Sequence, residues 1–334
     1  MTAPLLEVRD LVTRYETGGF LRGPTRRVYA VNGVSFDLAH GETLGLVGES
    51  GSGKSTVGRT ILRLTPATAG SVRFAGTDVL ASEGAALRAL RCRMQIVFQD
   101  PYSSLDPRMN LGRAVAEGLE IHRLVPPREI EARVAGLFEE VGLDPSYMAR
   151  YPHECSGGQR QRIGIARALA VNPEFLICDE PVSALDVSVQ AQVLNLLADL
   201  QKARGLAFLF IAHDLAVVRQ LAHRIAVMYF GRVVELAPAE TVIHHPRHPY
   251  TQALLSAVPV PDPARQRVRI VLTGEPPRPS APPSGCPFHS RCFHPMKNQR
   301  CLDELPLLRE VEGTMVACHH AEYAAAPAAT IPVP

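Results

Sequence analysis

The sequence predicts an α/β fold whose central sheet is largely parallel. Short apolar segments with strand character alternate with helical patterns, and several of them end in polar side chains: "MQIVF" is followed by Gln99, "EFLIC" by Asp179 and Glu180, and "LAFLFIA" by His213. A glycine-rich loop also joins one such strand to a helix. Alternating strands and helices produce parallel sheets, and ligands bind at the carboxyl ends of their strands. The sequence therefore predicts a ligand site along that edge of the sheet.

Length and charge limit the possible functions. The chain has 334 residues and a formal net charge of +2, from 35 basic and 33 acidic residues. This length fits one large domain with an appendage, and the near-neutral charge gives no field that would favour nucleic acid or an anionic membrane surface. The N-terminus lacks the apolar stretch of a signal peptide, and no segment approaches the roughly 18 apolar residues of a membrane span. We therefore expect a cytoplasmic protein that reaches a membrane only through a partner.

The glycine-rich loop has the pattern of a phosphate-binding loop. The segment "ETLGLVGESGSGKST" (42–56) satisfies G-x-x-x-x-G-K-[ST] and lies between a strand and a helix. The glycines let backbone N–H groups converge on phosphate oxygens, the helix start adds its dipole, and the lysine reaches the β- and γ-phosphates. We expect the nucleotide to be bound by Gly48, Glu49, Ser50, Gly51, Ser52, Gly53, Lys54, Ser55 and Thr56.

Two adjacent carboxylates complete a phosphate-hydrolysing site. Asp179 ends the strand "EFLICD" and is placed to bind Mg²⁺ together with the Ser55 hydroxyl, and Glu180 can polarise a water for attack on the γ-phosphate. Such a pair is weak evidence alone, because acidic residues often follow buried strands. Together with the phosphate loop it predicts ATP hydrolysis.

A second glycine turn raises the question of a second phosphate site. Ser156, Gly157 and Gly158 in "ECSGGQRQRIGIARAL" precede a helical pattern that ends before Pro173. A serine N-cap in a tight turn is the simple explanation. However, one triphosphate is already held by residues 48–55, so a second cradle is redundant within one chain. Two chains that meet head to tail could each offer this turn to the nucleotide of the other.

The motifs taken together resemble the ATP-binding subunits of ABC transporters. The phosphate loop, "CSGGQ", "CDEP" and "SALD" occur in this order, and the resemblance covers residues 5–245. It implies an ABC-type ATPase with a RecA-like core, an antiparallel β subdomain, a helical subdomain at about 100–170, and a small cysteine-rich C-terminal extension at 246–334. In this family the working unit is a dimer that closes on ATP and opens after hydrolysis.

The resemblance also implies a role for single residues. Ser156, Gly157, Gly158 and Gln159 would be the signature presented to the other subunit. Gln99 would sense the metal, so that Mg²⁺ is held by Ser55, Gln99 and Asp179. Glu180 would be the catalytic base, Asp186 would lie in the dimer contact loop, and His213 would contact the γ-phosphate. Tyr15 resembles the aromatic residue that stacks on adenine, although Tyr29 competes for this role.

Two positions depart from the usual family pattern. Cys155 stands where the signature usually opens with leucine, and Val182 stands where threonine usually follows "DEP". Neither change removes a phosphate ligand or a carboxylate, so we expect an active ATPase. In the helical subdomain, Val134, Leu137 and Phe138 recur at helical spacing and predict one buried stripe.

Four of the seven cysteines crowd the C-terminal tail as C-x5-C-x8-C-x16-C. Cys286, Cys292, Cys301 and Cys318 could hold a [4Fe–4S] cluster or a tetrahedral Zn²⁺ ion, and either would stabilise a tail too small for its own apolar core. Resemblance to oligopeptide importer ATPases with a similar tail favours the cluster. Nearby histidines leave mixed Cys/His zinc ligation open, and four unligated thiols are the remaining alternative: His289, His294, His319 and His320.

These features predict the ATPase subunit of an importer for short peptides. "HPY" at 248–250 resembles the C-terminal region of oligopeptide and dipeptide importer ATPases. The resemblance implies two permease subunits, an extracytoplasmic solute-binding protein, a second paralogous ATPase subunit and a peripheral position on the cytoplasmic face of the inner membrane. Nickel, glutathione or an oligosaccharide are alternative cargoes. A soluble ABC ATPase of DNA repair or translation, an exporter ATPase and a noncatalytic docking module are alternative functions.

Overall fold

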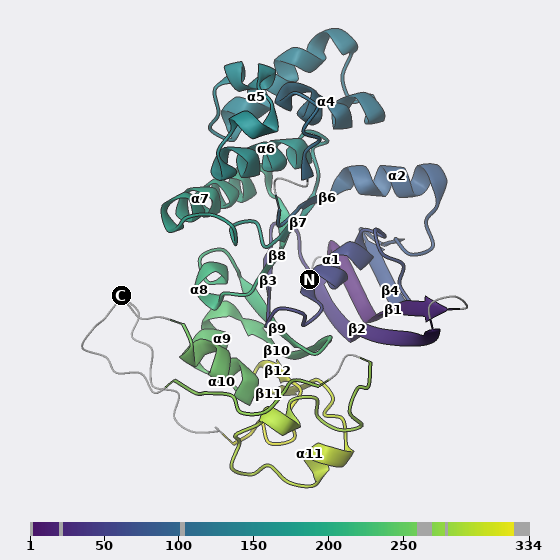
Figure 1. Cartoon of the computed structure of the whole chain (residues 1–334), viewed down its shortest axis with the longest axis vertical. Helices are drawn as coiled ribbons and strands as arrows, with labels where there is room; N and C mark the ends of the chain where they lie inside the picture. Colours follow the sequence, from purple (N-terminus) through teal and green to yellow (C-terminus); the bar gives the residue numbers. More distant parts are fainter. Residues whose placement is uncertain (1–2, 20–22, 101–103, 259–268, 278–279, 324–334) are drawn as a thin grey trace, which may run out of the picture. The chain divides into compact units, whose positions relative to one another are not determined.

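The computed structural model describes residues 3–19, 23–100, 104–258, 269–277 and 280–323 (Figure 1). The proline-rich segment at 258–266, part of that at 274–285, and the alanine- and proline-rich end at 324–334 therefore lie wholly or partly outside the described residues. The chain divides into two compact units. Unit 1 comprises Met1–Leu5, Leu38–Thr43 and Phe74–Ile211, and unit 2 comprises Leu6–Asp37, Leu44–Arg73 and Ala212–Pro334.

Unit 1 combines parallel strands with a group of helices. Its strands β6, β7 and β8 pair in parallel in the order β8-β7-β6, with Val97 opposite Cys178 and Asp179 opposite Ile211. The helices α4, α5 and α6 pack on one another, and α7 packs on α6 (Figure 1). The elements of this unit are β5 (Thr77–Asp78), α2 (Gly84–Arg93), β6 (Met94–Val97), α4 (Leu111–His122), α5 (Ile130–Glu140), α6 (Gly157–Leu169), β7 (Phe175–Asp179), α7 (Val187–Arg204) and β8 (Ala207–Ala212).

Unit 2 contains the phosphate loop and the C-terminal extension. In one of its sheets the strands are ordered β11-β12-β10-β9-β3, and in the other β2-β1-β4. Its elements are β1 (Leu6–Gly19), β2 (Gly23–Leu38), β3 (Thr43–Val47), α1 (Lys54–Ile61), β4 (Ala69–Phe74), α8 (Leu215–Val218), β9 (Arg224–Tyr229), β10 (Arg232–Pro238), α9 (Ala239–His244), α10 (Pro249–Ser256), α11 (Arg300–Asp303), β11 (Arg309–Val311) and β12 (Thr314–Val316).

The sheet of unit 2 is less parallel than the sequence analysis predicts. Only β3 and β9 pair in parallel, whereas β9, β10, β12 and β11 are antiparallel. Two of these three antiparallel pairings, β9 with β10 and β11 with β12, are closed by tight turns: Phe230-Gly231 and Glu312-Gly313 have positive φ at both positions, which is the geometry of two-residue hairpins. Because β12 pairs with β10, the C-terminal extension adds β12 and β11 to the sheet whose strand β3 leads into the phosphate loop.

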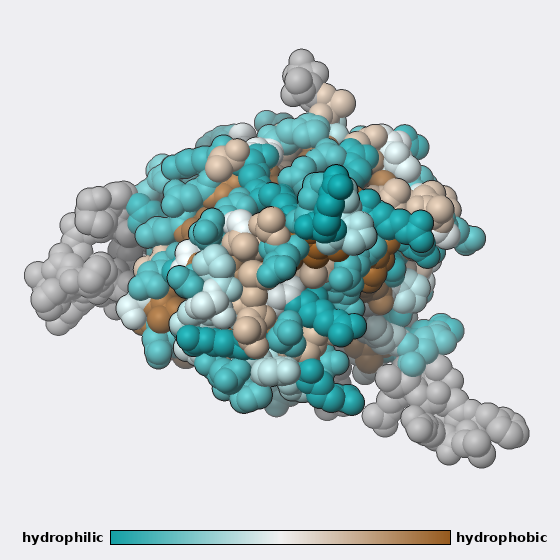
Figure 2. Space-filling model, turned by 90° about the horizontal axis from the view of Figure 1, so that it is seen from above, coloured by the Kyte–Doolittle hydropathy of each residue, from teal (hydrophilic) through white to brown (hydrophobic). Residues whose placement is uncertain are grey.

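The apolar pattern of the helical segment is confirmed. Val134, Leu137 and Phe138 on α5 are fully or almost fully buried, and the buried strands β7 and β8 are apolar on both faces. No helix among the described residues is long and apolar enough to cross a membrane. The face in Figure 2 is mainly hydrophilic, with apolar residues in small separate groups.

Candidate functional site

The phosphate loop of unit 2 has a backbone that only glycine permits at two positions. Gly53, the residue before α1, has φ 102°, and a Cβ atom there would lie 2.1 Å from the carbonyl oxygen of Ala30. A Cβ atom at Gly48 would lie 2.2 Å from the carbonyl oxygen of Met228. Both glycines are therefore required by close backbone approach, which explains the spacing of the motif.

Lys54 lies inside this loop. Its side chain is 4% exposed, and Nζ donates to the carbonyl oxygens of Gly48 at 2.8 Å and Glu49 at 3.0 Å. The Ser52 N–H donates to the Glu49 carbonyl at 3.1 Å. The ammonium group thus sits at the centre of a curved backbone at a helix start, the arrangement that binds phosphate.

Two tyrosines compete for the adenine-stacking role, and their surroundings differ. The Tyr15 hydroxyl donates to Thr56 Oγ1 at 3.4 Å, so this side chain, 37% exposed, lies beside the phosphate-loop helix. The guanidinium of Arg14 lies 4.9 Å from the ring centroid of Tyr29 and covers that ring. The geometry therefore favours Tyr15, and its contact with adenine stays a prediction.

In unit 1, the polar residues predicted at the strand ends come together. Asp179 at the end of β7 is 1% exposed. Gln99, which follows β6, donates from Nε2 to Glu180 Oε2 at 3.0 Å. Glu180 has φ 47°, a left-handed conformation, and its N–H donates to the Ile211 carbonyl at 2.9 Å. Strained backbone of this kind occurs at functional sites, where it directs one side chain. His213 lies in unit 2 and is exposed.

The signature turn caps its own helix. Ser156 Oγ accepts from the Gln159 N–H at 3.3 Å, while Gln159 Oε1 accepts from the Ser156 N–H at 2.9 Å, which is a complete capping box at the start of α6. Gln159 Nε2 also donates to the Tyr147 hydroxyl at 3.0 Å. A Cβ atom at Gly158 would lie 2.4 Å from Val189 Cγ1, so glycine is required for packing against α7.

The two departures from the family pattern are buried. Cys155 and Val182 are 6% and 4% exposed, and burial raises the pKa of the Cys155 thiol. Both positions therefore act as small apolar packing residues rather than as ligands. Asp186, in the predicted dimer loop, precedes α7 and is exposed, and the neighbouring Val187 is 84% exposed.

The four C-terminal cysteines line one small cavity in unit 2, with a volume of about 20 Å³. None of the cysteines in the described structure forms a disulfide. Burial raises the pKa of Cys286 to about 12 and of Cys318 to about 11. Among the described residues, no three Cys, His, Asp or Glu side chains are arranged to hold a single metal ion. The fold therefore brings the four thiols together at one cavity.

Two of the nearby histidines have backbone partners. His294 is buried, with Nε2 3.1 Å from the Tyr323 carbonyl oxygen and Nδ1 accepting from the Met296 N–H at 3.2 Å. His319 Nε2 lies 2.9 Å from the Glu304 carbonyl oxygen. Backbone groups thus hold these two imidazoles, whereas Nε2 of His320, which lines the same cavity as the thiols, is buried without a hydrogen-bond partner in the described structure. Mixed Cys/His ligation therefore stays an alternative to the four thiols.

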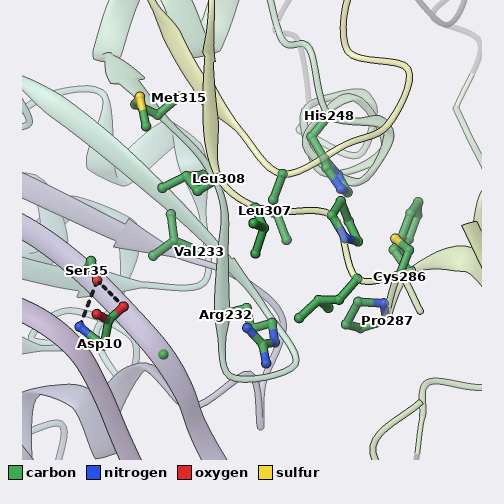
Figure 3. A pocket seen from close by; sticks show the side chains of 16 residues that line it. Asp10, Ser35, Arg232, Val233, His248, Cys286, Pro287, Leu307, Leu308 and Met315 are labelled. Carbon is green, nitrogen blue, oxygen red and sulfur yellow. Dashed lines mark hydrogen bonds between the residues drawn. The ribbon is translucent and has the colours of Figure 1, made fainter. Parts of the chain in front are cut away.

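A larger cavity of about 450 Å³ adjoins the small cavity that the four cysteines line (Figure 3). His248, Cys286 and Phe288 line both cavities. In Figure 3, Cys286 lies on the side of the cavity opposite the hydrogen-bonded pair Asp10 and Ser35. Apolar side chains of β10, β12 and residues 305–308 form most of the remaining wall. One of the four thiols therefore borders a space large enough for a small molecule.

Sequence reasoning missed a buried carboxylate beneath the "HPY" segment. Glu235, in the middle of β10, accepts from the N–H groups of Arg247 at 2.8 Å and His248 at 3.0 Å. Burial raises the pKa of Glu235 to about 7 despite these bonds, and burial lowers the pKa of His248 to about 3. A glutamate within the apolar run "RVVELAP" was the available signal.

Two family models match the chain. Residues 31–183 match the ABC transporter model, and residues 234–301 match the model of the oligopeptide/dipeptide transporter C-terminal region. These matches cover the phosphate loop, the signature and the "HPY" segment. They also include three of the four C-terminal cysteines.

Curated relatives match along almost the whole chain. An oligopeptide transport ATP-binding protein of Bacillus subtilis is 52% identical over 95% of both chains. A peptide ABC transporter ATP-binding protein of Sinorhizobium fredii is 51% identical over 96% of this chain and 90% of its own length. A glutathione import ATP-binding protein of Escherichia coli is 55% identical over 81% of this chain, which corresponds to 44% of that protein.

A solved structure shows the same fold. It is a dimeric, post-hydrolysis ATP-binding cassette bound to ADP and phosphate, with a TM-score of 0.63 and 27% identity, and the match covers 70% of this chain and 98% of that one. A part of an ABC transporter complex from Clostridium perfringens has a TM-score of 0.62 at 26% identity over 72% of this chain.

Proposed function

This chain belongs to the ATP-binding subunits of ABC transporters of the peptide-import type, and we propose that its nucleotide is enclosed between its own phosphate loop and the signature turn of a second ATPase subunit. The chain is an ATPase coupled to peptide import. The observation that supports this enclosed arrangement, a nucleotide sandwich, is that the chain has two different glycine-containing helix starts. Lys54 lies in the phosphate loop, while Ser156 and Gly157 form a separate turn at the start of α6. The similar dimeric cassette with ADP and phosphate supports it.

We assign each side chain of the nucleotide site its own role in ATP hydrolysis. Lys54 and the loop amides bind the β- and γ-phosphates, and Glu180 accepts a proton from the attacking water, whose oxygen bonds to the γ-phosphorus as the bond to the β–γ bridging oxygen breaks. The products are ADP and phosphate. Gln99 Nε2 donates to Glu180 Oε2 at 3.0 Å and so orients the base. We assign His213 the role of γ-phosphate ligand. The donor set of Ser55, Gln99 and Asp179 fits Mg²⁺, which would neutralise charge on the phosphates.

The transporter partners follow from the family. ABC importer ATPases work with two membrane permeases and an external solute-binding protein, and we place this chain on the cytoplasmic face of the membrane with a paralogous ATPase as its dimer partner. Ile121 and Leu124, near the end of α4, are 59% and 43% exposed and offer apolar contacts in the helical subdomain for a permease. For the domain organisation of the chain, we propose a helical subdomain at about 100–170 and a C-terminal extension at 246–334.

The four C-terminal cysteines are proposed to hold a [4Fe–4S] cluster. Their convergence on one cavity supports this, and the raised pKa values of Cys286, Cys292 and Cys318 mean that a metal must displace protons to bind. The cluster would supply four strong bonds that fasten the extension. Iron and acid-labile sulfide should both be found in anaerobically purified protein. A colourless sample with one equivalent of zinc would show that Zn²⁺ is the cofactor instead, and a sample with neither would show free thiols.

Peptides are the cargo class that the relatives support, and glutathione, itself a tripeptide, is a second candidate because of the relative from Escherichia coli. Affinity purification of the membrane-extracted complex tests the function. Permeases and a solute-binding protein should be recovered, and the ligand of the binding protein identifies the cargo. Recovery of ribosomes or DNA without permeases would instead support a non-transport ATPase.

The sandwich has its own test. A Glu180→Gln chain should form a stable dimer with its partner ATPase in ATP, measured by size-exclusion chromatography with light scattering. Adding Ser156→Arg to both subunits should abolish this dimer, because the bulky side chain blocks the turn. A dimer that survives this change would exclude the proposed sandwich.

A further inference from the structure

The loop between Cys286 and Cys292 contacts the phosphate loop directly. Arg291 donates from Nη1 to Glu49 Oε2 at 2.8 Å and from Nη2 to Glu49 Oε1 at 3.1 Å. The two partners are separated by 242 positions in the sequence, yet both lie in unit 2. The Arg291 side chain is only 11% exposed. The Glu49 side chain is 38% exposed, so the pair combines a largely buried guanidinium with a partly exposed carboxylate. Its bidentate geometry fixes orientation as well as distance.

A second contact from the same region fixes the backbone of Glu49. The hydroxyl of Tyr250, in the "HPY" segment, accepts from the Glu49 N–H at 2.8 Å. Tyr250 is fully buried, and its ring packs at 4.6 Å from that of Tyr229 and at 5.5 Å from that of Phe288. Phe288 belongs to the same cysteine loop as Arg291. The side chain and the backbone of Glu49 are thus both held by the C-terminal part of the chain.

Glu49 in turn holds the residues that bind phosphate. Its carbonyl oxygen accepts from Lys54 Nζ at 3.0 Å and from the Ser52 N–H at 3.1 Å. A rotation of the Glu49 peptide would therefore move the acceptor of the phosphate-binding lysine. The contacts form a continuous chain from the cysteine loop through Arg291 and Glu49 to Lys54.

We propose that Arg291 is a positioning residue for ATP binding, through which the cysteine loop sets the nucleotide affinity of the phosphate loop. The proposal rests on the ATPase function of the chain. Arg291 acts through Glu49 and does not touch the nucleotide. Because coupling between two sites is reciprocal, bound nucleotide must also restrain the cysteine loop.

A double-mutant cycle in nucleotide affinity tests the proposal. Arg291→Gln and Glu49→Gln should each raise the Kd for mant-ATP by about tenfold, within the usual range of coupling between sites. The double variant should be no weaker than either single one, because both remove the same contact. Arg291→Lys should recover part of the affinity, and Tyr250→Phe should weaken binding less. Arg300→Gln, which removes an exposed pair with Glu304, is the matched control and should leave the Kd unchanged.

Hydrogen–deuterium exchange supplies the reciprocal readout. AMP-PNP should slow the exchange of the backbone amides of residues 288–292 in the parent chain, measured by peptide mass spectrometry, and this protection should disappear in Arg291→Gln. An unchanged Kd in Arg291→Gln, additive effects in the double variant, or equal protection in both proteins would overturn the proposal. If Arg291→Gln does not fold, Arg291→Lys and Tyr250→Phe decide in the same assays. A parent chain that neither binds nor hydrolyses ATP would instead refute the ATPase function itself.

Discussion

The phosphate loop and the signature turn are both glycine-containing helix starts, but they are held in different ways. The signature turn is held mainly by its own neighbours, since Ser156 and Gln159 cap each other within four residues. The phosphate-loop helix has no side-chain cap at Gly53, and distant residues shape the loop instead. A turn that caps itself is a local structure, whereas a loop held from outside depends on the rest of its unit. The two turns should therefore respond differently to mutation.

The largest expected effect is on the proposed ATP hydrolysis and concerns Glu180. Glu180→Gln should lower ATPase kcat by about 10²- to 10⁴-fold, because the general base is lost, while ATP binding is retained. Steady-state hydrolysis and equilibrium nucleotide binding measure the two quantities. Glu174→Gln, which alters a partly exposed ion pair with Arg93 in the same unit, is the control and should keep its turnover. Unchanged turnover in Glu180→Gln would refute the assigned base.

Glycine-to-alanine changes test the difference between the two turns most directly. Gly53→Ala should weaken ATP binding by about 5- to 150-fold, since a strained backbone costs about 1–3 kcal/mol and the new Cβ would meet Ala30. Gly157→Ala places its Cβ at an ordinary 3.5 Å from Leu185. It should leave nucleotide binding by the single chain intact and lower only the turnover of the dimer. Equal losses of nucleotide affinity in both variants would contradict the difference between the two turns.

The segment that contacts the phosphate loop through Tyr250 is itself bound to a titrating carboxyl, that of Glu235. The pKa of Glu235 is raised from 4.5 to about 7 by burial, so the folded chain binds more protons than the unfolded chain between these values. Its contribution to stability therefore falls by about 3 kcal/mol as the pH rises through this window. His248, with its pKa lowered to about 3, acts in the opposite direction below its ordinary value of 6.5.

Because the two groups oppose each other, the variant must be compared with the parent. Urea unfolding at pH 5 and pH 7.5 should show that Glu235→Gln loses less stability between these pH values than the parent chain. The same measurement on Glu304→Gln, whose carboxylate is exposed, pairs with Arg300 and has a lowered pKa, provides the control. Parallel pH profiles for Glu235→Gln and the parent would show that Glu235 is not the titrating group.

The smallest expected effect concerns the caps. Ser156→Ala removes the N-cap of α6 and should lower the free energy of unfolding by about 1 kcal/mol. Ser52→Ala in the phosphate loop should cost less, because Ser52 Oγ is buried without a hydrogen-bond partner in the described structure. Urea denaturation of the two variants measures the difference. A larger loss at Ser52 would mean that the phosphate loop, too, depends on its own serine.

Much of the site could be predicted because its parts are short-range. The phosphate loop, the capped signature turn and the strand-end residues Gln99, Asp179 and Glu180 are each encoded within a few positions, and the apolar strands before them are confirmed. The antiparallel edge of unit 2 was missed although its turns, Phe230-Gly231 and Glu312-Gly313, are also local. The Tyr15 and Tyr29 side chains could not be ranked without knowing that Arg14 covers the Tyr29 ring.

The sequence by itself determined the chemical groups of the nucleotide site and the order in which they occur, because backbone sterics and capping act between neighbouring residues. Only the tertiary structure decided what holds the phosphate loop. Arg291 and Glu49 meet across 242 positions, and β12 joins β10 although a long connection separates them. Such contacts depend on the packing of whole elements. The identities of Arg291, Glu49 and Tyr250 alone do not reveal that these residues meet.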